Sequence, residues 1–250
     1  MPKIHVLLKK EELDGVRLPG KVVIVLDVLF ATSTIVTALA SGAKEVIPTL
    51  DEAAARRAAD GLAKDSYVIS GELNAITIDG FAPPTPQALV AHGIAGKTLI
   101  YCTTNGTVAL GKSADAAHVY AASLLNGPAV VSAVAAEHVD RSLLIVCSGS
   151  ADNFNLEDFF GAGYLVDLFA TALGPGAEFS DAALAARFLY KGSRPVDCLL
   201  AARVGRMMVE RGVEDEVRFA AQRGKFDVVP VLVDGRLVVA STPPLFQTGK

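Results

Sequence analysis

The sequence predicts an α/β fold: a mainly parallel sheet with helices on both faces. Strand-like apolar runs alternate with helix-like segments over the first 150 residues. Several of these runs are apolar almost throughout, as is typical of strands buried on both faces. Four of them end in clusters of small polar residues without arginine or lysine. Because ligands bind at the carboxyl edge of open α/β sheets, we expect the clusters to form one site.

The composition excludes several classes of protein. The chain has 250 residues, of which 51% are hydrophobic and 20% charged, as in globular proteins. Its net charge of −4, with no basic face, argues against a nucleic-acid partner. The apolar runs have strand length, so we expect no membrane span. The amino terminus lacks a signal-peptide pattern and the three cysteines are unpaired in spacing, which favours a cytoplasmic protein. An Ala- and Val-rich surface is compatible with a homodimer.

The alternating elements of the first 150 residues follow from local signals. The run KVVIVLDV predicts a strand over 21–28, and Gly42 ends the helix expected after it. Asp51 caps a helix rich in Ala and Arg, and Pro128 fits the first turn of another. The four residues 83–86, three of them prolines, leave 71–86 irregular. The predicted strands are 21–28, 45–48, 67–70, 98–102, 118–121 and 142–147, and the predicted helices are 33–41, 51–61, 87–92, 106–112 and 128–138.

The pattern changes after residue 150. Helices are predicted over 156–172, 181–190 and 199–211, with Gly212 as the stop of the last. Two strands, 227–233 and 236–240, flank Asp234-Gly235, a strong signal for a two-residue hairpin turn. We therefore predict an α/β domain over 1–150 and a C-terminal helical portion over 151–250 that closes with this hairpin.

The first polar cluster centres on Asp27. Its carboxylate follows a buried strand and is followed by Thr32, Ser33 and Thr34, whose hydroxyls suit substrate binding. At the mouth of a sheet such a carboxylate can bind a divalent metal, act as a base or attack as a nucleophile. The structural alternative is that it bonds only the backbone amides of the next turn.

The second cluster comprises residues 103–107 at a strand-to-helix turn. Thr104, Asn105, Gly106 and Thr107 offer hydroxyls, an amide and backbone N–H groups that attract an anion. These four are therefore candidate substrate-binding residues. The alternative is an ordinary Asn-Gly turn.

Acidic residues predict a metal site. Glu72 follows Gly71, and Glu157 and Asp158 stand at the start of the long predicted helix. Together with Asp27 they form an oxygen-rich set suited to Mg²⁺, which needs only one or two carboxylates plus water. A solvated loop explains Glu72 equally well, and a favourable charge in the first helical turn explains at least one of the other two acids.

The last cluster begins with Cys147, followed by Ser148 and Gly149. Cys147 is a candidate nucleophile and its two neighbours are candidate substrate contacts. A nucleophilic thiol needs a nearby base, and no motif links a histidine to it. The alternative is a small core residue.

These motifs resemble the 2-phosphosulfolactate phosphatase family. The similar segments are residues 27–34, 71–72, 103–107, 156–159 and 227–230, which span nearly the whole chain. Members of that family are Mg²⁺-dependent phosphatases that act in the synthesis of coenzyme M. The resemblance implies an α/β enzyme, catalytic roles for Asp27 and Glu72, and a small-molecule substrate.

The sequence departs from the family at its basic residues. Phe30, Leu73 and Val108 stand where the family carries cations, so Phe30 and Leu73 are the expected substrate contacts at two of these places. Residues 81–86 and Ala220 depart from the family pattern as well. A charge-assisted hydrogen bond contributes roughly 1.5–3 kcal/mol, so losing three cations costs roughly 5–9 kcal/mol with a dianionic ligand.

Three hypotheses follow from this loss. The chain is a phosphatase for a substrate less anionic than phosphosulfolactate, a different hydrolase or lyase acting on a small carbonyl compound, or a non-catalytic binding protein. Cations from the C-terminal portion would favour the first hypothesis if one of them reached the site. The candidates are Arg187, Lys191, Arg194, Arg203 and Arg206.

Overall fold

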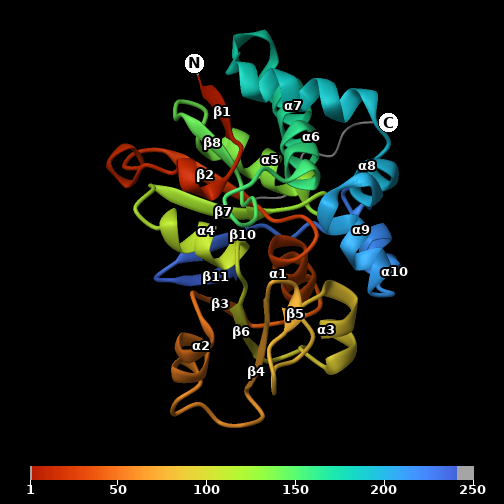
Figure 1. Cartoon of the computed structure of the whole chain (residues 1–250). Coiled ribbons are helices and arrows are strands. Elements are labelled where there is room, and N and C mark those ends of the chain that lie inside the picture. Colours follow the sequence, from red (N-terminus) through yellow and green to blue (C-terminus); the bar gives the residue numbers. More distant parts are fainter. Residues whose placement is uncertain (1, 241–250) are drawn as a thin grey trace, which may run out of the picture.

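A mixed sheet forms the centre of the molecule (Figure 1). The computed structural model describes residues 2–240. The strand order is β5-β4-β6-β3-β11-β10-β7-β2-β8-β1-β9, with most neighbours parallel. The predicted α/β class is confirmed. The last ten residues of the predicted C-terminal portion lie outside the described residues, and the division at residue 150 stays a prediction.

The elements occupy most of the described chain. The strands are β1 Lys3–Leu7, β2 Val22–Leu26, β3 Glu45–Thr49, β4 Tyr67–Leu73, β5 Ile76–Thr77, β6 Thr98–Cys102, β7 His118–Ala122, β8 Leu143–Cys147, β9 Glu178–Phe179, β10 Pro230–Val233 and β11 Arg236–Val239. The helices are α1 Ala31–Ala40, α2 Glu52–Ala58, α3 Pro86–His92, α4 Gly106–Lys112, α5 Gly127–Glu137, α6 Leu156–Leu173, α7 Asp181–Gly192, α8 Pro195–Ala201, α9 Arg203–Glu210 and α10 Glu214–Ala220. The 3₁₀ turns are η1 Lys10–Glu12, η2 Gly15–Arg17 and η3 Gly174–Gly176.

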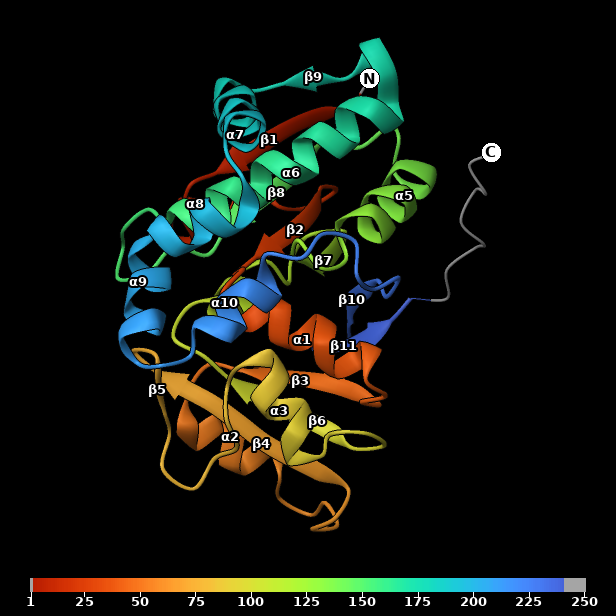
Figure 2. The same ribbon diagram turned by 90° about the vertical axis from the view of Figure 1, so that its right-hand side faces the viewer.

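The predicted hairpin joins two parallel sections of the sheet. Asp234 and Gly235 both adopt positive φ, 49° and 76°, as a tight two-residue turn requires. The hairpin lies between β7 and β3 (Figure 2). Val231 pairs with Tyr120 on one side and Leu237 pairs with Val46 on the other, both antiparallel. Residues 230–239 thus sit in the middle of the sheet.

Alternate residues of the central strands supply two separate cores. Ile24 and Leu26 of β2 pack with residues of α5 and α6. Val23 and Val25 pack with residues of α1 and α4 on the other face. This two-sided burial explains why β2 has no polar residue before Asp27.

Several segments differ from the sequence prediction, which contained neither strand β9 nor helix α10. Strand β1 was not predicted, because its exposed and half-buried positions give it no continuous apolar run. Strand β4 extends three residues past the predicted end and turns back into β5. The helix predicted over 199–211 is two helices, since the extended backbone of Ala202 separates α8 from α9. A Cβ on Gly205 would clash with the backbone of Leu199, so the glycine permits this close crossing.

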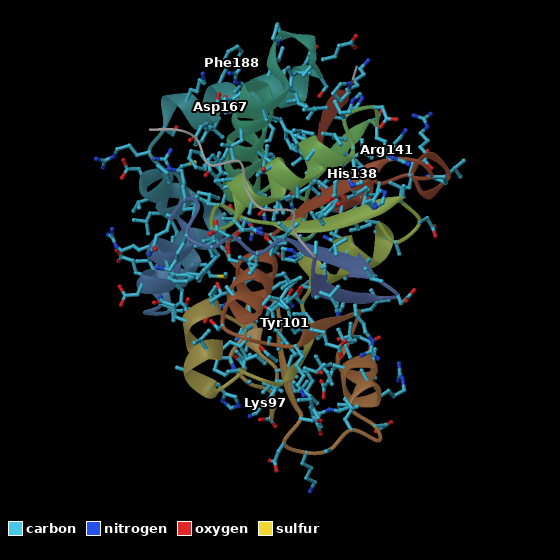
Figure 3. The ribbon with its side chains drawn as sticks, turned by 180° about the vertical axis from the view of Figure 1, so that it is seen from behind. Lys97, Tyr101, His138, Arg141, Asp167 and Phe188 are labelled. Atoms are coloured by element: carbon cyan, nitrogen blue, oxygen red, sulfur yellow. The ribbon has the colours of Figure 1, made fainter. Side chains whose placement is uncertain are left out.

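The proline-rich segment is fixed to the core rather than free. Tyr101, which lies beside α1 in Figure 3, is fully buried, and its hydroxyl donates to the Pro84 carbonyl at 2.5 Å. The Thr34 hydroxyl donates to the same carbonyl at 2.9 Å. The Ser70 hydroxyl donates to the Pro83 carbonyl at 2.8 Å. These three bonds hold α1, β4 and β6 together.

The hairpin gives a first testable prediction. Leu237 is fully buried between the two parallel sections, so Leu237→Ala is expected to lower the free energy of unfolding by about 2–5 kcal/mol. Val239 lies on the same strand but is 44% exposed, and Val239→Ala should cost less than about 1 kcal/mol. Urea denaturation followed by circular dichroism measures both, and equal losses would contradict the central role of Leu237.

Candidate active site

One cavity collects side chains from widely separated parts of the chain. Its volume is about 140 Å³. Carboxylates, amides, one guanidinium and several apolar side chains share its wall. The lining residues are Asp27, Phe30, Glu72, Asn74, Ala75, Thr104, Asn105, Ser150, Ala151, Asn155, Glu157, Arg203, Val204 and Met207. Residues from all four predicted clusters therefore meet at one place, joined by Glu157 from the start of α6. They are Asp27, Glu72, Asn105 and Ser150, the last residue of the cluster that begins with Cys147.

Asp27 is held firmly between helix starts. The Thr32 hydroxyl accepts from the Asp27 backbone N–H and donates to its carbonyl, both at 3.0 Å. The carboxylate accepts backbone hydrogen bonds from Phe30, Ala31 and Gly106. Burial, together with the nearby charge of Glu72, nonetheless raises the pKa of Asp27 to about 7. Asp27 thus bonds its own turn and also faces the cavity.

The contact between Asp27 and Gly106 shows that the sheet is strongly curved. Four strands separate β2 from β6 in the sheet order. With strands about 4.8 Å apart, a flat sheet would place these two strands about 24 Å from each other. A Cβ on Gly106 would instead lie 2.6 Å from Asp27 Oδ2, so only glycine fits there. The curvature brings the two carboxyl ends together.

Glu72 is fixed by a network around a tight turn. Its carboxylate accepts from the Thr104 backbone N–H at 2.6 Å and from the Thr104 hydroxyl at 3.1 Å. It also accepts from the Ala75 backbone N–H at 2.5 Å. Asn74 and Ala75 form the β4–β5 turn with φ of 53° and 61°, and the Arg211 guanidinium donates to the Ala75 carbonyl. Glu72 is therefore a buried strand residue, not the solvated loop glutamate of the structural alternative.

The two acids at the start of α6 have different surroundings. Glu157 lines the cavity, and burial followed by the charge of Asp27 raises its pKa to about 7. Asp158 faces away from the cavity and accepts from the backbone N–H groups of Val28 at 2.9 Å and Gly149 at 3.3 Å. Burial raises the pKa of Asp158 well above its ordinary value. Asp158 thus joins β2 to the loop after β8.

One of the five candidate cations reaches the cavity. Arg203 lines its wall and donates to the Ser150 hydroxyl and, at 3.4 Å, to the Asn155 side-chain oxygen. Its charge partly offsets the raised pKa of Glu157. Three of the other four are ion-paired elsewhere, Arg187 and Lys191 with Asp167 and Arg194 with Asp197.

Arg203 also borders a second, larger cavity. This outer cavity has a volume of about 590 Å³ and shares Ala151, Asn155, Glu157 and Arg203 with the inner one. Arg206, the fifth candidate cation, lies on its wall. Asn155, Glu157 and Arg203 thus belong to the walls of both cavities.

Several predicted site residues lie away from the inner cavity. Four hydroxyls bond backbone groups instead: Thr32, Ser33, Thr34 and Thr107. Leu73 is 62% exposed beyond the turn. Ser148 and Gly149 are buried behind the cavity, and so is Cys147, whose pKa is raised well above the ordinary value by burial. A thiol kept protonated in the core is a poor nucleophile, which favours the reading of Cys147 as a core residue.

The acidic side chains around the inner cavity determine whether it can hold a metal ion. Within residues 2–240, no group of three or more His, Cys, Asp or Glu side chains is arranged to hold an ion. Asp27, Glu72 and Glu157 nevertheless line one cavity. Burial and the charge of Glu72 raise the pKa of Asp27, and burial and the charge of Asp27 raise the pKa of Glu157. Mg²⁺ commonly takes one or two carboxylates and completes its shell with water and substrate phosphate. The residues present fit that kind of site and not a cage of four protein carboxylates.

Sequence reasoning missed one charged side chain beside the cavity. Lys10 is buried, and its ammonium donates to the side-chain oxygen of Asn105 at 2.9 Å. In the sequence it stands in the charged run Lys9-Lys10-Glu11-Glu12, which reads as a solvated segment. No spacing in the sequence links it to Asn105, 95 residues later.

The curved α/β sheet with an acidic cavity at its carboxyl edge defines a small-molecule enzyme site. The family model described as 2-phosphosulpholactate phosphatase matches residues 7–235. The chain therefore belongs to this family, which is a family of phosphatases and hence of hydrolases. Within the residues described, no helix is long and apolar enough to cross a bilayer.

Curated relatives agree with the family model. A protein of Symbiobacterium thermophilum named "Probable 2-phosphosulfolactate phosphatase" is 37% identical over 225 residues, which cover 89% of this chain and 95% of the relative. Relatives of the same name from Carboxydothermus hydrogenoformans and Clostridium beijerinckii are 35% and 29% identical, and each alignment covers at least 94% of both proteins. The resemblance expected from the sequence motifs is confirmed.

The raised pKa of Asp27 predicts a pH-dependent stability. In the absence of metal, the folded protein holds the Asp27 proton up to about pH 7, whereas the unfolded chain releases it near pH 4. Stability contributed by this proton is therefore lost as pH rises from about 4 to about 7. Asp27→Asn removes the titration, so the stability of the variant relative to wild type should improve by about 1–3 kcal/mol between pH 4.5 and 8. Chemical denaturation in EDTA measures this difference, and a constant gap between the two proteins would refute the shift.

Proposed function

We propose that this protein is a Mg²⁺-dependent phosphatase that hydrolyses a small phosphomonoester less anionic than 2-phosphosulfolactate. Members of the matching family are phosphatases, and the cavity decides which ester suits this chain. It also includes a cytoplasmic location, a homodimer and no nucleic-acid partner, as the composition suggests.

The balance of charge in the inner cavity is the observation that carries the proposal. Among the described lining residues, Arg203 is the one cation, and it shares the wall with the carboxylates of Asp27, Glu72 and Glu157. Phe30, Val204 and Met207 make part of the same wall apolar. One guanidinium supports binding of a single phosphoryl group. A second strong anion in the inner cavity would meet carboxylates or an apolar surface, which disfavours its binding.

A divalent cation would complete the site. Asp27 and Glu157 are the residues that would hold Mg²⁺, because both carboxyl groups line the same cavity and the charge of Asp27 adds to burial in raising the pKa of Glu157. When bound, the ion supplies positive charge to the phosphoryl oxygens and to the carboxylates around it.

The protein's own groups orient the substrate. In the reaction, a water oxygen bonds to phosphorus, the ester P–O bond breaks, and the alcohol leaves with a proton as inorganic phosphate forms. Arg203 binds phosphoryl oxygens from the side of α9, while the Asn105 amide faces them from the start of α4. The bonds from Thr104 and Ala75 fix the Glu72 carboxylate and turn the β4–β5 loop toward the cavity. Phe30 and Met207 limit access of bulk water.

An activity panel tests the proposal directly. Phosphorylated hydroxy acids of one, two and three formal anionic groups are assayed for phosphate release with Mg²⁺ and with EDTA. We expect Mg²⁺-dependent release, fastest with the least anionic acids. Absence of release from every ester would contradict the phosphatase proposal and favour a different hydrolase, a lyase or a binding protein.

Arg203 should be required for this activity. Arg203→Met removes one charge-assisted hydrogen bond of roughly 1.5–3 kcal/mol, so kcat/KM should fall about 10- to 150-fold. Arg194→Met removes the same charge from a side chain that is 83% exposed and paired with Asp197, and is the matched control. Its kcat/KM should stay within about twofold of wild type. Equal effects of the two substitutions would show that Arg203 acts only through net charge.

Phe30 should control the preference between substrates. Phe30→Arg places a cation on the cavity wall and is expected to raise kcat/KM for the more anionic esters about tenfold relative to the less anionic ones. Leu73→Arg adds the same charge at a position 62% exposed and off the wall, and should change the ratio little. The ratio of kcat/KM for the two classes of ester is the measurement. An unchanged ratio in Phe30→Arg would remove Phe30 from the specificity argument.

A further inference from the structure

We propose that Lys10 is a positioning residue for the proposed phosphatase reaction: it fixes the Asn105 side chain so that the amide NH₂ donates into the inner cavity. The inference rests on the proposed function for its kinetic part and on the geometry alone for its structural part. Lys10 itself is not among the residues that line the inner cavity.

Lys10 is a buried cation with a full set of acceptors. The residue is 6% exposed. Its ammonium donates to Asn105 Oδ1 at 2.9 Å and to the Ser148 carbonyl at 3.3 Å, and it pairs with Glu11 at 3.0 Å. An ammonium has three protons to donate, so these three partners use them all.

The surroundings leave Lys10 little freedom to move. Its backbone N–H donates to the same Ser148 carbonyl at 3.4 Å. The loop after β8 packs tightly on the preceding residue, because a Cβ on Gly149 would lie 2.9 Å from Lys9 Cβ. A fixed backbone and three bonded protons make Lys10 a rigid donor, not a mobile surface charge.

The chemistry of lysine determines the orientation of Asn105. An ammonium can only donate, so the amide atom that faces Lys10 must be the oxygen. The NH₂ group then points away from Lys10. No side-chain or backbone acceptor within the described residues is recorded for it, and Asn105 lines the inner cavity. Its two protons are thus available to a ligand oxygen.

This orientation matters for the kind of ligand that binds. With the amide reversed, Asn105 would present an oxygen to a cavity already lined by the carboxylates of Asp27, Glu72 and Glu157. Phosphoryl oxygens accept hydrogen bonds and would be repelled by a further oxygen. Lys10 therefore fixes the Asn105 amide so that its NH₂ group can donate to an anionic oxygen of the ligand. Lys10 does this without touching the substrate.

A double-mutant cycle tests the inference. Lys10→Met, Asn105→Ala and the double variant of the full-length protein are compared by kcat/KM on the best ester and by affinity for inorganic phosphate. We expect each single variant to lose at least about tenfold, the equivalent of one hydrogen bond to a charged oxygen. The double variant should lose no more than Asn105→Ala alone, because Lys10 acts through Asn105. Lys10→Arg, which keeps a donor, should recover part of the loss.

A spectroscopic measurement separates positioning from stability. The side-chain amide signals of Asn105 in a ¹⁵N–¹H spectrum, assigned by their absence in Asn105→Ala, should shift in Lys10→Met. The matched control is Lys112→Met, which removes the same charge from the exposed far end of α4. The Asn105 amide signals should not shift in this control. If Lys10→Met does not fold, Lys10→Gln replaces it, since the shorter side chain withdraws the donor from Asn105.

The outcomes distinguish this inference from the proposed function. Additive losses in the cycle, or unshifted Asn105 signals in a folded Lys10 variant, would overturn the role of Lys10 even in an active phosphatase. Absence of both hydrolysis and phosphate binding in the wild-type protein would overturn the proposed function and the kinetic part of the inference. A shift of the Asn105 signals would then still support the orientation that Lys10 imposes.

Discussion

The half-buried Asp27 at the end of β2 is the constraint on which the site depends. Its charge sits between the first turns of α1 and α4, where the backbone N–H groups of Phe30, Ala31 and Gly106 bond it. Those bonds require β2 and β6, which have four strands between them in the sheet order, to end close to each other. The glycine at 106 permits the approach, because a Cβ there would clash with Asp27. This contact joins the loops after β2 and β6 beside the cavity that Asp27 and Asn105 line.

Several acidic side chains lie close together in this region, and the fold gives them different surroundings. All three acids have raised pKa values, but Asp158 accepts from backbone N–H groups and serves the fold, whereas Asp27 and Glu157 line the cavity. Glu72 combines both features, because a backbone N–H group bonds its carboxylate and the residue also lines the cavity. A cavity of this kind attracts cations and, through Arg203, a single anionic group. That combination supports a phosphoryl substrate with little further charge.

The sequence predicted much of this arrangement and missed specific parts for physical reasons. The apolar runs of β2, β6 and β8 are buried on both faces, so their pattern was clear. The Asp234-Gly235 turn was predicted from its residues, but its place between β7 and β3 depends on pairing with distant strands. The break between α8 and α9 falls at an alanine, which carries no helix-stop signal. The hydroxyls of Thr32 and Thr34 bond backbone groups, since a turn next to a buried helix must satisfy its own polar atoms.

By itself, the sequence determined the α/β class, the family and the set of acids at the carboxyl edge, because these follow from local pattern and motif. Only the tertiary structure decided which of those acids face the cavity and which cations join them. Arg203 and Lys10 come from opposite ends of the chain, and their charges reach the site because a curved sheet brings α9 and η1 to one edge. A contact between residues far apart in the chain has no periodicity, so no local pattern contains it.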